Sequence, residues 1–386
     1  MTGQPGQLEH DSVPPPSHRR SGRERAERGP SLTARAAARL LLLAIVSFTT
    51  VPPLLLPGAE PGASLLEELG RRAALLAFGL LGLQVVLSAR LRFADLAVGL
   101  DTLLRAHRAV GVLVLLLLLA HPTLLVLASH GDMPFLRWQL LLGVFALLVL
   151  TAGVLSALLF RFLRMDFNRW RAIHRAMILV VLLGAAHARA AGSDLQGAPA
   201  LRAWWSALLA VALGVLAWRH LVVRRYRLRR FRVESVRPEA RGVWTIQLVP
   251  EGGRPLRYLP GQFIFLTLLR AAAPTEEHPF TISSPPSRPG FITATVKESG
   301  DFTRTIGLTR SGDHALVEGP FGRFSFAHHP ARRFLFISAG VGCTPIASML
   351  RYLSDSGDSR PALYLCANRT EEDIASERSS LGYPSA

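Results

Sequence analysis

Six stretches of the chain are apolar over the length that is needed to cross a membrane. They lie near residues 37–57, 72–90, 107–128, 138–160, 172–190 and 203–222. A helix spans a bilayer with about 20 consecutive apolar residues, and each stretch approaches that length. The fifth begins among charged residues and has the weakest pattern. Together they predict a membrane α-helical bundle of six transmembrane helices.

The pattern changes near Phe231, where short strand-like runs replace the long apolar stretches. Residues 243–249 and 263–269 alternate or run apolar, with Pro and Gly between such runs, which predicts a small antiparallel β-barrel. From Arg333 the chain reads as strand, glycine turn and helix, and a second strand follows at 362–368. This order is typical of an α/β nucleotide-binding domain. About 55 residues are too few for a complete domain, so we expect a partial one.

These patterns divide the chain into four parts. Residues 1–34 are rich in Pro, Ser, Gly and Arg and carry no apolar periodicity, so we expect a disordered tail. The tail is too long for the start of a secretory signal, which indicates that the first span is retained. Residues 35–222 would form the membrane domain, 223–329 the β-barrel and 330–386 a truncated nucleotide-binding domain.

Charge predicts the orientation of the helices. The chain of 386 residues has a net charge of +17 and a mean hydropathy of +0.29. Its arginines cluster between spans two and three, between spans four and five, and at 219–232. By the positive-inside bias, both termini are expected to be cytoplasmic, in a plasma or inner membrane. Because the basic residues belong to these loops, the lipid bilayer is the expected partner and nucleic acid is disfavoured.

Histidines within the apolar stretches are the candidate redox ligands. Span three carries His107 and His121, and span five carries His174 and His187. Ionisable residues at membrane depth are costly and mark functional sites. The two histidines of each span are separated by roughly 20 Å along a helix axis. The two cysteines of the chain are too few for an iron–sulfur cluster held by four cysteines.

Helix direction decides how the histidines pair. Spans three and five both run from the inside to the outside, so His107 would face His174 and His121 would face His187. Each pair could supply the two axial ligands of one haem, which predicts two b-type haems. The spacing of 13 residues in span five does not return to the same helix face. His187 therefore requires a local distortion of the helix or an off-axis approach. Interhelical hydrogen bonding of the histidines is the alternative.

Motifs behind the membrane stretch resemble those of ferric reductases and NADPH oxidases. They are LPGQF (259–263), HPFTISS (278–284), VKESGDFT (296–303), VEGPFG (317–322) and AGVGCTP (339–345). The first two look like the flavin-binding barrel of that family, and the last is similar to its nicotinamide-phosphate loop. The resemblance covers roughly residues 37–370. It implies a ferredoxin-reductase-like barrel that binds FAD, a six-span domain with two b-type haems, and NADPH or NADH as the electron donor.

The resemblance also implies roles for individual residues. It places Thr281 near the reactive nitrogen N5 of the flavin, as the catalytic residue. Pro279 and Phe280 would form a rigid turn and an apolar shelf for the flavin ring, and His278 would contact the pyrophosphate or the ribityl chain. The further expected cofactor-binding residues are Ser283, Ser284, Lys297, Gly300, Phe302, Thr303, Gly340, Gly342, Thr344 and Pro345. A simple β-strand turn at HPFT is the alternative.

Local physical chemistry supports parts of this assignment. Phe302 and Thr303 are expected to begin a helix whose free N–H groups face the flavin phosphates. The glycines of the AGVGCTP loop would let the backbone approach the nicotinamide cofactor closely. Thr344 can cap the next helix, with Pro345 in its first turn.

The resemblance therefore implies an electron path from NADPH or NADH through FAD and the two haems to a small-molecule or metal-chelate acceptor on the outer side. A superoxide-producing oxidase is one alternative, but Leu125 stands where such enzymes carry a further histidine. The other is a non-autonomous redox subunit that a partner protein supplies with electrons. Members of the family carry a Cys-Gly-Pro block and a terminal aromatic residue. Neither occurs in this sequence, and this difference suggests the alternative.

Overall fold

A computed structural model describes residues 31–370, apart from 61, 132–136, 161, 166, 272, 330 and 369. The predicted N-terminal tail lies outside the described residues up to position 30. Residues 371–386 of the predicted nucleotide-binding domain lie outside them too. The chain forms two compact units, Leu32–Leu228 and a second unit whose described part begins at Ser31 and resumes at Arg229.

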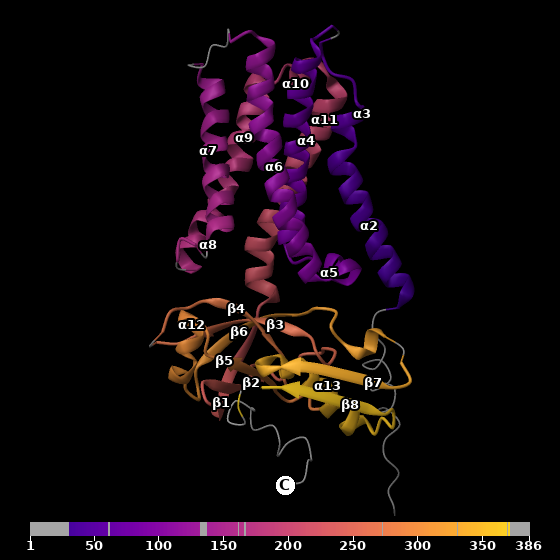
Figure 1. The fold of residues 1–386 in the computed structure, drawn as a ribbon, viewed down its shortest axis with the longest axis vertical. Coiled ribbons are helices and arrows are strands. Elements are labelled where there is room, and N and C mark those ends of the chain that lie inside the picture. Colours follow the sequence, from indigo (N-terminus) through magenta and orange to yellow (C-terminus); the bar gives the residue numbers. More distant parts are fainter. Residues whose placement is uncertain are drawn as a thin grey trace, which may run out of the picture. The chain divides into compact units, whose positions relative to one another are not determined.

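Six helical stretches of the described chain are long and apolar enough to cross a membrane (Figure 1). They are α2 (Leu32–Thr50) with α3 (Pro52–Leu55), α4 (Leu65–Ser88), α6 (Leu100–Ala128), α7 (Trp138–Leu159), α8 (Phe167–Arg175) with α9 (Met177–Ala191), and α11 (Pro199–Ala217) with the start of the π-helical segment η1 (Trp218–Arg227). The short helices α5 (Arg92–Val98) and α10 (Ser193–Gly197) join consecutive spans. The predicted six-helix bundle is confirmed.

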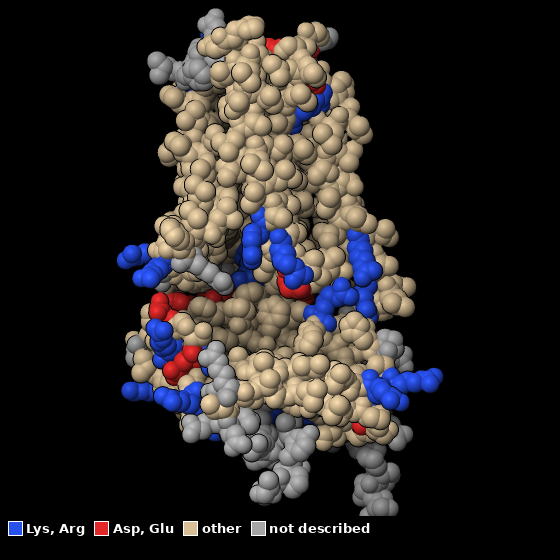
Figure 2. Space-filling model, in the orientation of Figure 1, with Lys and Arg blue, Asp and Glu red and all other residues tan. Residues whose placement is uncertain are grey.

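The outer surface of the bundle is apolar. Leu116 on α6 and Phe145 and Leu148 on α7 are each more than half exposed. In a bilayer, lipid chains surround such side chains, and the helix satisfies its own backbone polar groups. Figure 2 shows this almost uncharged belt, with charged side chains near its ends. The surface is that of an integral membrane protein.

Helix α4 is the packing centre of the bundle and the most deeply buried of the spans. Two of its glycines allow neighbouring helices to approach. A Cβ atom added to Gly79 would lie 1.9 Å from the carbonyl oxygen of Thr49 on α2. At Gly82 it would lie 2.5 Å from the side chain of Leu208 on α11. Small residues of this kind let helix backbones meet inside a membrane.

The second unit contains an antiparallel sheet. Its strands are β1 (Arg229–Ala240), β2 (Val243–Pro250), β3 (Phe263–Leu269), β4 (Glu277–Thr281), β5 (Ile292–Lys297) and β6 (His314–Phe321). They follow the order β4-β3-β6-β1-β2-β5, and a bridge from Ile282 to Ala294 joins the two edges. Phe231, Ile246 and Leu266 fill the interior. The predicted antiparallel β-barrel is confirmed.

A short α/β segment follows the barrel. It consists of β7 (Phe334–Ala339), the 3-10 turn η4 (Gly340–Cys343), α13 (Thr344–Ser356) and β8 (Ala362–Ala367), with η2 (Ile306–Leu308) and η3 (Phe326–His328) as short turns before it. The two strands are parallel, and α13 packs Ile346 and Met349 against Phe336. The other face of the strands exposes Ile337 and Leu363, which are 67% and 60% exposed. The predicted opening of an α/β domain is confirmed.

Gly79→Ala tests the close packing of α2 on α4. The added methyl group would collide with the main chain of Thr49, so we expect the bundle to lose about 1–3 kcal/mol of stability. Gly214→Ala is the matched control, because a Cβ added there meets nothing within 4 Å and alanine favours a helix. Thermal unfolding of the full-length protein in detergent is the measurement. Equal unfolding midpoints of the two variants would contradict the packing.

Candidate functional site

The four membrane histidines form two facing pairs. His107 on α6 and His174 on α8 have ring centres 5.9 Å apart, with ring planes inclined by 72°. His121 on α6 and His187 on α9 have ring centres 6.3 Å apart, with planes inclined by 70°. The pairing predicted from spacing and helix direction is confirmed.

A break in the fifth span brings both of its histidines to the side of α6. Helices α8 and α9 are separate, with Ala176 between them. There the N–H of Ala176 donates to the carbonyl of Ile173 at 3.0 Å, so the turn tightens toward three residues. The 13-residue spacing left two alternatives, a local distortion of the helix or an off-axis approach of His187. The structure shows a distortion, which lies between His174 and His187.

Backbone carbonyl groups orient His121 and His187, which we call the outer pair after the orientation that the arginine clusters predict. Nδ1 of His121 lies 2.9 Å from the carbonyl oxygen of Gly70, and Nδ1 of His187 lies 2.8 Å from that of Gln139. A carbonyl can only accept, so in the neutral rings each Nδ1 carries the proton and each Nε2 keeps a lone pair. This is the tautomer of a histidine that binds a metal through Nε2.

His107 and His174, which we call the inner pair after the same prediction, are oriented differently. Nδ1 of His107 and Nδ1 of His174 are buried and have no hydrogen-bond partner among the described residues. The indole ring of Trp170 stacks on His174, with ring centres 5.2 Å apart and planes inclined by 20°. Sequence reasoning did not single out Trp170, although its place one turn before His174 on the same helix face is a readable signal.

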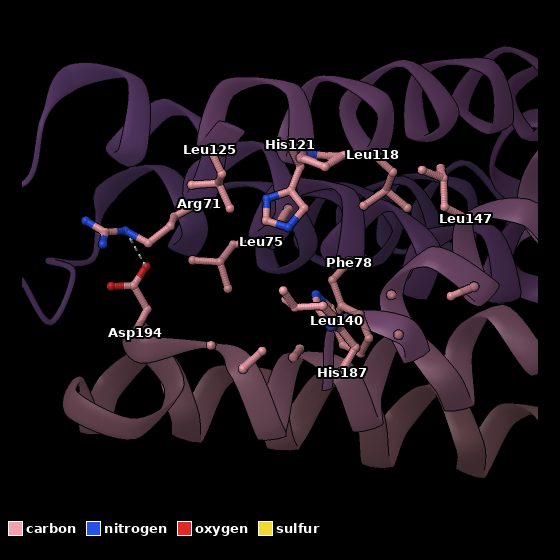
Figure 3. A pocket seen from close by; sticks show the side chains of 18 of the residues that line it. Arg71, Leu75, Phe78, Leu118, His121, Leu125, Leu140, Leu147, His187 and Asp194 are labelled. Atoms are coloured by element: carbon pink, nitrogen blue, oxygen red, sulfur yellow. Dashed lines mark ion pairs between the residues drawn. The ribbon is translucent and has the colours of Figure 1, made fainter. Parts of the chain in front are cut away.

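A cavity of about 400 Å³ surrounds the outer pair (Figure 3). His121 and His187 line it, and an ion pair of 3.7 Å between Arg71 and Asp194 lies at its edge. The other walls are largely apolar and include Leu75, Phe78, Leu118, Leu125, Leu140 and Leu147. A Cβ atom added to Gly143 would lie 2.9 Å from the ring of His187. The glycine therefore makes room for that imidazole.

Both histidine pairs fit the axial positions of a haem. Metal–nitrogen bonds of about 2 Å place two opposed imidazole centres about 6 Å apart, which matches both pairs. Within the described ranges, no three His, Cys, Asp or Glu side chains gather into a site for a bare metal ion. A haem needs only two axial ligands from the protein. The oriented Nε2 lone pairs and the apolar walls of the outer cavity suit such a group.

The expected flavin shelf lies on β4, an edge strand of the barrel. Pro279 is exposed, while Phe280 and Thr281 are half-buried. Phe280 also packs against the barrel core. The strand can therefore present an apolar surface and a hydroxyl group to a flat ligand, and the catalytic role of Thr281 stays a prediction.

Ser283 and Ser284 are buried in the barrel. The hydroxyl of Ser283 lies 2.8 Å from that of Thr293. The hydroxyl of Ser284 accepts from the N–H of Thr293 at 3.0 Å and lies 2.9 Å from the hydroxyl of Tyr258. Burial raises the pKa of Tyr258, so this phenol stays protonated and can donate. The two serines fix the chain just after Thr281, and their direct contact with a flavin stays a prediction.

His278 and Phe302 form an aromatic stack. Their ring centres lie 4.1 Å apart, with planes inclined by 21°. Nε2 of His278 lies 2.8 Å from the carboxylate of Glu276. The guanidinium of Arg270 lies 5.0 Å from the ring centre of Phe302, which is buried in the barrel core. Phe302 therefore positions the neighbouring turn from inside the barrel.

The helix expected at Phe302 is confirmed as the single turn α12 (Asp301–Arg304), which begins one residue earlier. Oγ1 of Thr303 accepts from the N–H of Gly300 at 2.8 Å. A Cβ atom added to Gly300 would meet nothing within 4 Å, so the backbone there is open to a ligand. Lys297 is exposed at the end of β5.

The expected nicotinamide loop is the turn η4. Gly340 has φ +52, and added Cβ atoms at Gly340 and Gly342 would meet nothing within 4 Å. The predicted capping role of Thr344 is wrong, because Cys343 occupies the N-cap position and Thr344 is already helical. Its hydroxyl donates back to a carbonyl of the turn at 3.0 Å. The turn runs directly into α13, with Pro345 in the first turn of the helix as predicted.

Helix α13 is fastened to the segment that follows β4 by side chains that sequence reasoning missed. Ser348 donates to the carbonyl oxygen of Ser284 at 2.6 Å, and Arg351 donates to that of Ser283 at 3.0 Å. Asp355 follows one turn later. The spacing of these polar residues along one side of the helix is the signal that could have revealed them.

Two parts of the chain match known families. Residues 73–185 match the family described as ferric reductase like transmembrane component, and residues 244–325 match a family described as FAD-binding domain. The first match includes His107, His121 and His174 and ends two residues before His187. Together the two matches indicate an electron-transfer oxidoreductase that uses FAD.

Curated relatives are similar over part of their length. The stachydrine N-demethylase reductase subunit Stc4 of Rhizobium meliloti (strain 1021) is 39% identical over 148 residues, which are 37% of this chain and 42% of the relative. The NADH oxidoreductase HCR of Escherichia coli (strain K12) is 30% identical over 158 residues, 40% of this chain and 48% of the relative. The chain therefore spans less than half the length of each.

Solved structures are also similar in part. The FAD/NAD-binding domain of nitric oxide dioxygenase from Vibrio cholerae O1 biovar El Tor is 27% identical, with a TM-score of 0.36, over 40% of this chain and 68% of that one. The flavohaemoglobin from Malassezia yamatoensis is 14% identical, with a TM-score of 0.39, over 91% of this chain and 80% of that one. The fold assignment rests on the elements of the chain itself.

Asp355→Asn tests the attachment of α13. Asp355 accepts from Ser287 at 2.5 Å and from Arg288 at 3.1 Å. Burial would raise the pKa of Asp355, but these bonds outweigh it and hold the pKa below its usual range. The carboxylate therefore stabilises the fold above the pKa of the unfolded chain, near 4. This stability is lost as the pH falls through the lower folded pKa.

At pH 7 we expect Asp355→Asn to cost about 1 kcal/mol and to flatten the loss of stability on acidification. Unfolding followed by flavin fluorescence between pH 7 and pH 3 is the measurement. Asp101→Asn, which changes an exposed carboxylate of the helical unit, is the control. An unchanged acid profile of the Asp355 variant would contradict the role of its carboxylate.

Proposed function

Because the chain has the domain architecture of the ferric reductase and NADPH oxidase family, we propose a transmembrane oxidoreductase. It moves electrons from NADPH or NADH through FAD and two b-type haems to an acceptor on the outer side of a membrane. The observation that carries the proposal is the pair of facing imidazole couples, 5.9 Å and 6.3 Å between ring centres, inside an apolar bundle.

The barrel would hold the flavin. FAD accepts a two-electron hydride and releases single electrons. Thr281 and Phe280 on β4 would contact the ring, and the open backbone at Gly300 would face the phosphates. The loop with Gly340 and Gly342 would receive the nicotinamide donor at the carboxyl end of β7. The relatives named as reductases support this type of donor.

The bundle would hold the haems, which carry one electron each. His107 and His174 would ligate the inner haem, and His121 and His187 the outer one. The contribution of the protein is to fix the imidazole planes and to exclude water with apolar walls. Arginine clustering supports a cytoplasmic place for both termini.

The outer acceptor would be a small molecule or a metal chelate. Leu125 lines the outer cavity where a superoxide-producing oxidase would carry a histidine, so oxygen is the less favoured acceptor. A redox subunit that receives electrons from a partner protein is the second candidate.

Anaerobic spectra of the purified full-length protein, before and after addition of NADPH or NADH, test the proposal. We expect two low-spin haems per chain, flavin bleaching and reduction of both haems. Bleaching without haem reduction would contradict the path, and reduction only by an added partner would favour the second candidate. One haem or none per folded chain would contradict the two-haem assignment.

Two histidine variants test the order of transfer. In His174→Ala the inner haem loses an axial ligand, so the electron should stop at the flavin. In His187→Ala the inner haem should still be reduced, while reduction of an external ferric chelate should stop. Flavin content measured in both variants controls for misfolding. If His187→Ala abolishes reduction of both haems while the flavin is retained, the inner and outer assignments are wrong.

Gly143→Val tests the space beside His187. Its Cβ would lie 2.9 Å from the imidazole, so the ring must move and the haem content should fall from two to about one per chain. Gly214→Val adds the same side chain where a Cβ meets nothing within 4 Å, and it should keep both haems. The pyridine haemochrome assay is the measurement, and two haems in Gly143→Val would refute the expectation.

A further inference from the structure

The indole N–H of Trp170 is buried and has no hydrogen-bond partner among the described residues. Trp205, which lines the cavity around His121 and His187, also has a buried indole N–H without a partner among the described residues, whereas two other indoles of the chain have acceptors. Trp204 donates to the carbonyl oxygen of Phe48 at 2.7 Å, and Trp244 donates to the carboxylate of Glu298 at 2.6 Å. A buried indole N–H usually has an acceptor, so the site of Trp170 is suited to an acceptor other than the residues that the structure describes.

Trp170 is held firmly in place. Its ring contacts Phe160, with centres 5.8 Å apart, and Phe167, with centres 5.6 Å apart. Its third aromatic neighbour is His174, one turn along the same helix, whose ring is nearly parallel to the indole at an inclination of 20°. An indole held by two phenylalanine rings can fix the imidazole in turn.

The two histidine pairs differ in what orients them. Both rings of the outer pair have a carbonyl oxygen within 2.9 Å of Nδ1. Neither Nδ1 atom of the inner pair has a partner in the described part of the chain. For His174 the stack with Trp170 takes the place of the hydrogen bond that fixes a ligating imidazole elsewhere.

We propose that Trp170 is a positioning residue of the inner haem site, with two separate tasks. Its ring sets the plane of the His174 imidazole, and its N–H donates to a carboxylate of the haem. The propionate carboxylates are the hydrogen-bond acceptors on the rim of a haem, whose other substituents are hydrocarbon. The inference rests on the proposed function, since it requires a haem between His107 and His174.

Two substitutions in the full-length, haem-loaded protein separate the tasks. Trp170→Phe keeps a stacking ring and removes the donor, whereas Trp170→Leu removes both. Trp204→Phe is the matched control, because it removes an indole N–H of the same bundle whose acceptor is the carbonyl of Phe48. The readouts are the rate of haem transfer to apomyoglobin and the electron paramagnetic resonance of the ferric haems, whose g-values depend on the imidazole planes.

In Trp170→Phe we expect one of the two haems to leave about tenfold faster, as for loss of one hydrogen bond to a charged group, with unchanged g-values. In Trp170→Leu the same haem should leave faster and one low-spin signal should also shift. Trp204→Phe should change neither readout. The outer haem, retained in each variant, reports that the bundle is folded.

The outcomes distinguish the inference from the proposed function. A wild-type protein without haem would overturn both. A two-haem protein whose Trp170→Phe variant releases haem at the wild-type rate would overturn only the propionate bond. Unchanged g-values in Trp170→Leu would overturn the role of the stack. Loss of both haems from Trp170→Phe would contradict a role confined to the inner site.

Discussion

Imidazole is a polar group whose nitrogen atoms are costly to bury in a hydrocarbon environment without hydrogen-bond partners or a metal, and the helical unit is organised around four such rings. The outer rings use backbone carbonyls of Gly70 and Gln139. The inner rings keep a buried Nδ1 without a partner among the described residues. The room for the rings comes from small residues, of which Gly143 beside His187 is the clearest. The packing of the helices therefore determines where the histidine rings can lie in this bundle.

In the β-barrel, hydroxyl groups rather than imidazoles are the polar side chains that must be satisfied in the interior. Ser283, Thr293 and Thr295 share short contacts inside the barrel, which fix the chain behind the exposed residues of β4. Helix α13 reaches the same segment through Ser348 and Arg351. The turn that precedes α13 is thereby tied to the strand that would carry the flavin ring. A ligand that binds at β4 or at the turn before α13 would therefore meet a preformed surface.

Spacing and direction were enough to predict the spans and the histidine pairs, because apolar length and the 3.6-residue period act locally. The spacing in span five also required either a distortion or an off-axis approach of His187, but neither the choice between them nor the place of the distortion could be predicted. Ala176 stands in a run without Pro or Gly, so nothing local marks the break. The capping role predicted for Thr344 was wrong because nothing local shows that the preceding turn already has near-helical geometry, which moves the N-cap to Cys343. Ser283 and Ser284 were expected at the cofactor, but their burial depends on how the barrel closes at Ile282.

One face of β7 and β8 is covered by no other described residue, and this has a practical meaning for handling the protein. Leu335, Ile337, Leu363 and Leu365 are each more than half exposed on it, and a parallel sheet is normally covered on both faces. An apolar patch of this kind in water attracts amphiphiles and other copies of itself. A detergent added to solubilise the bundle also binds apolar surface of this kind where it is open to water. A bound detergent mass above what a single hydrophobic belt requires would reveal that second surface.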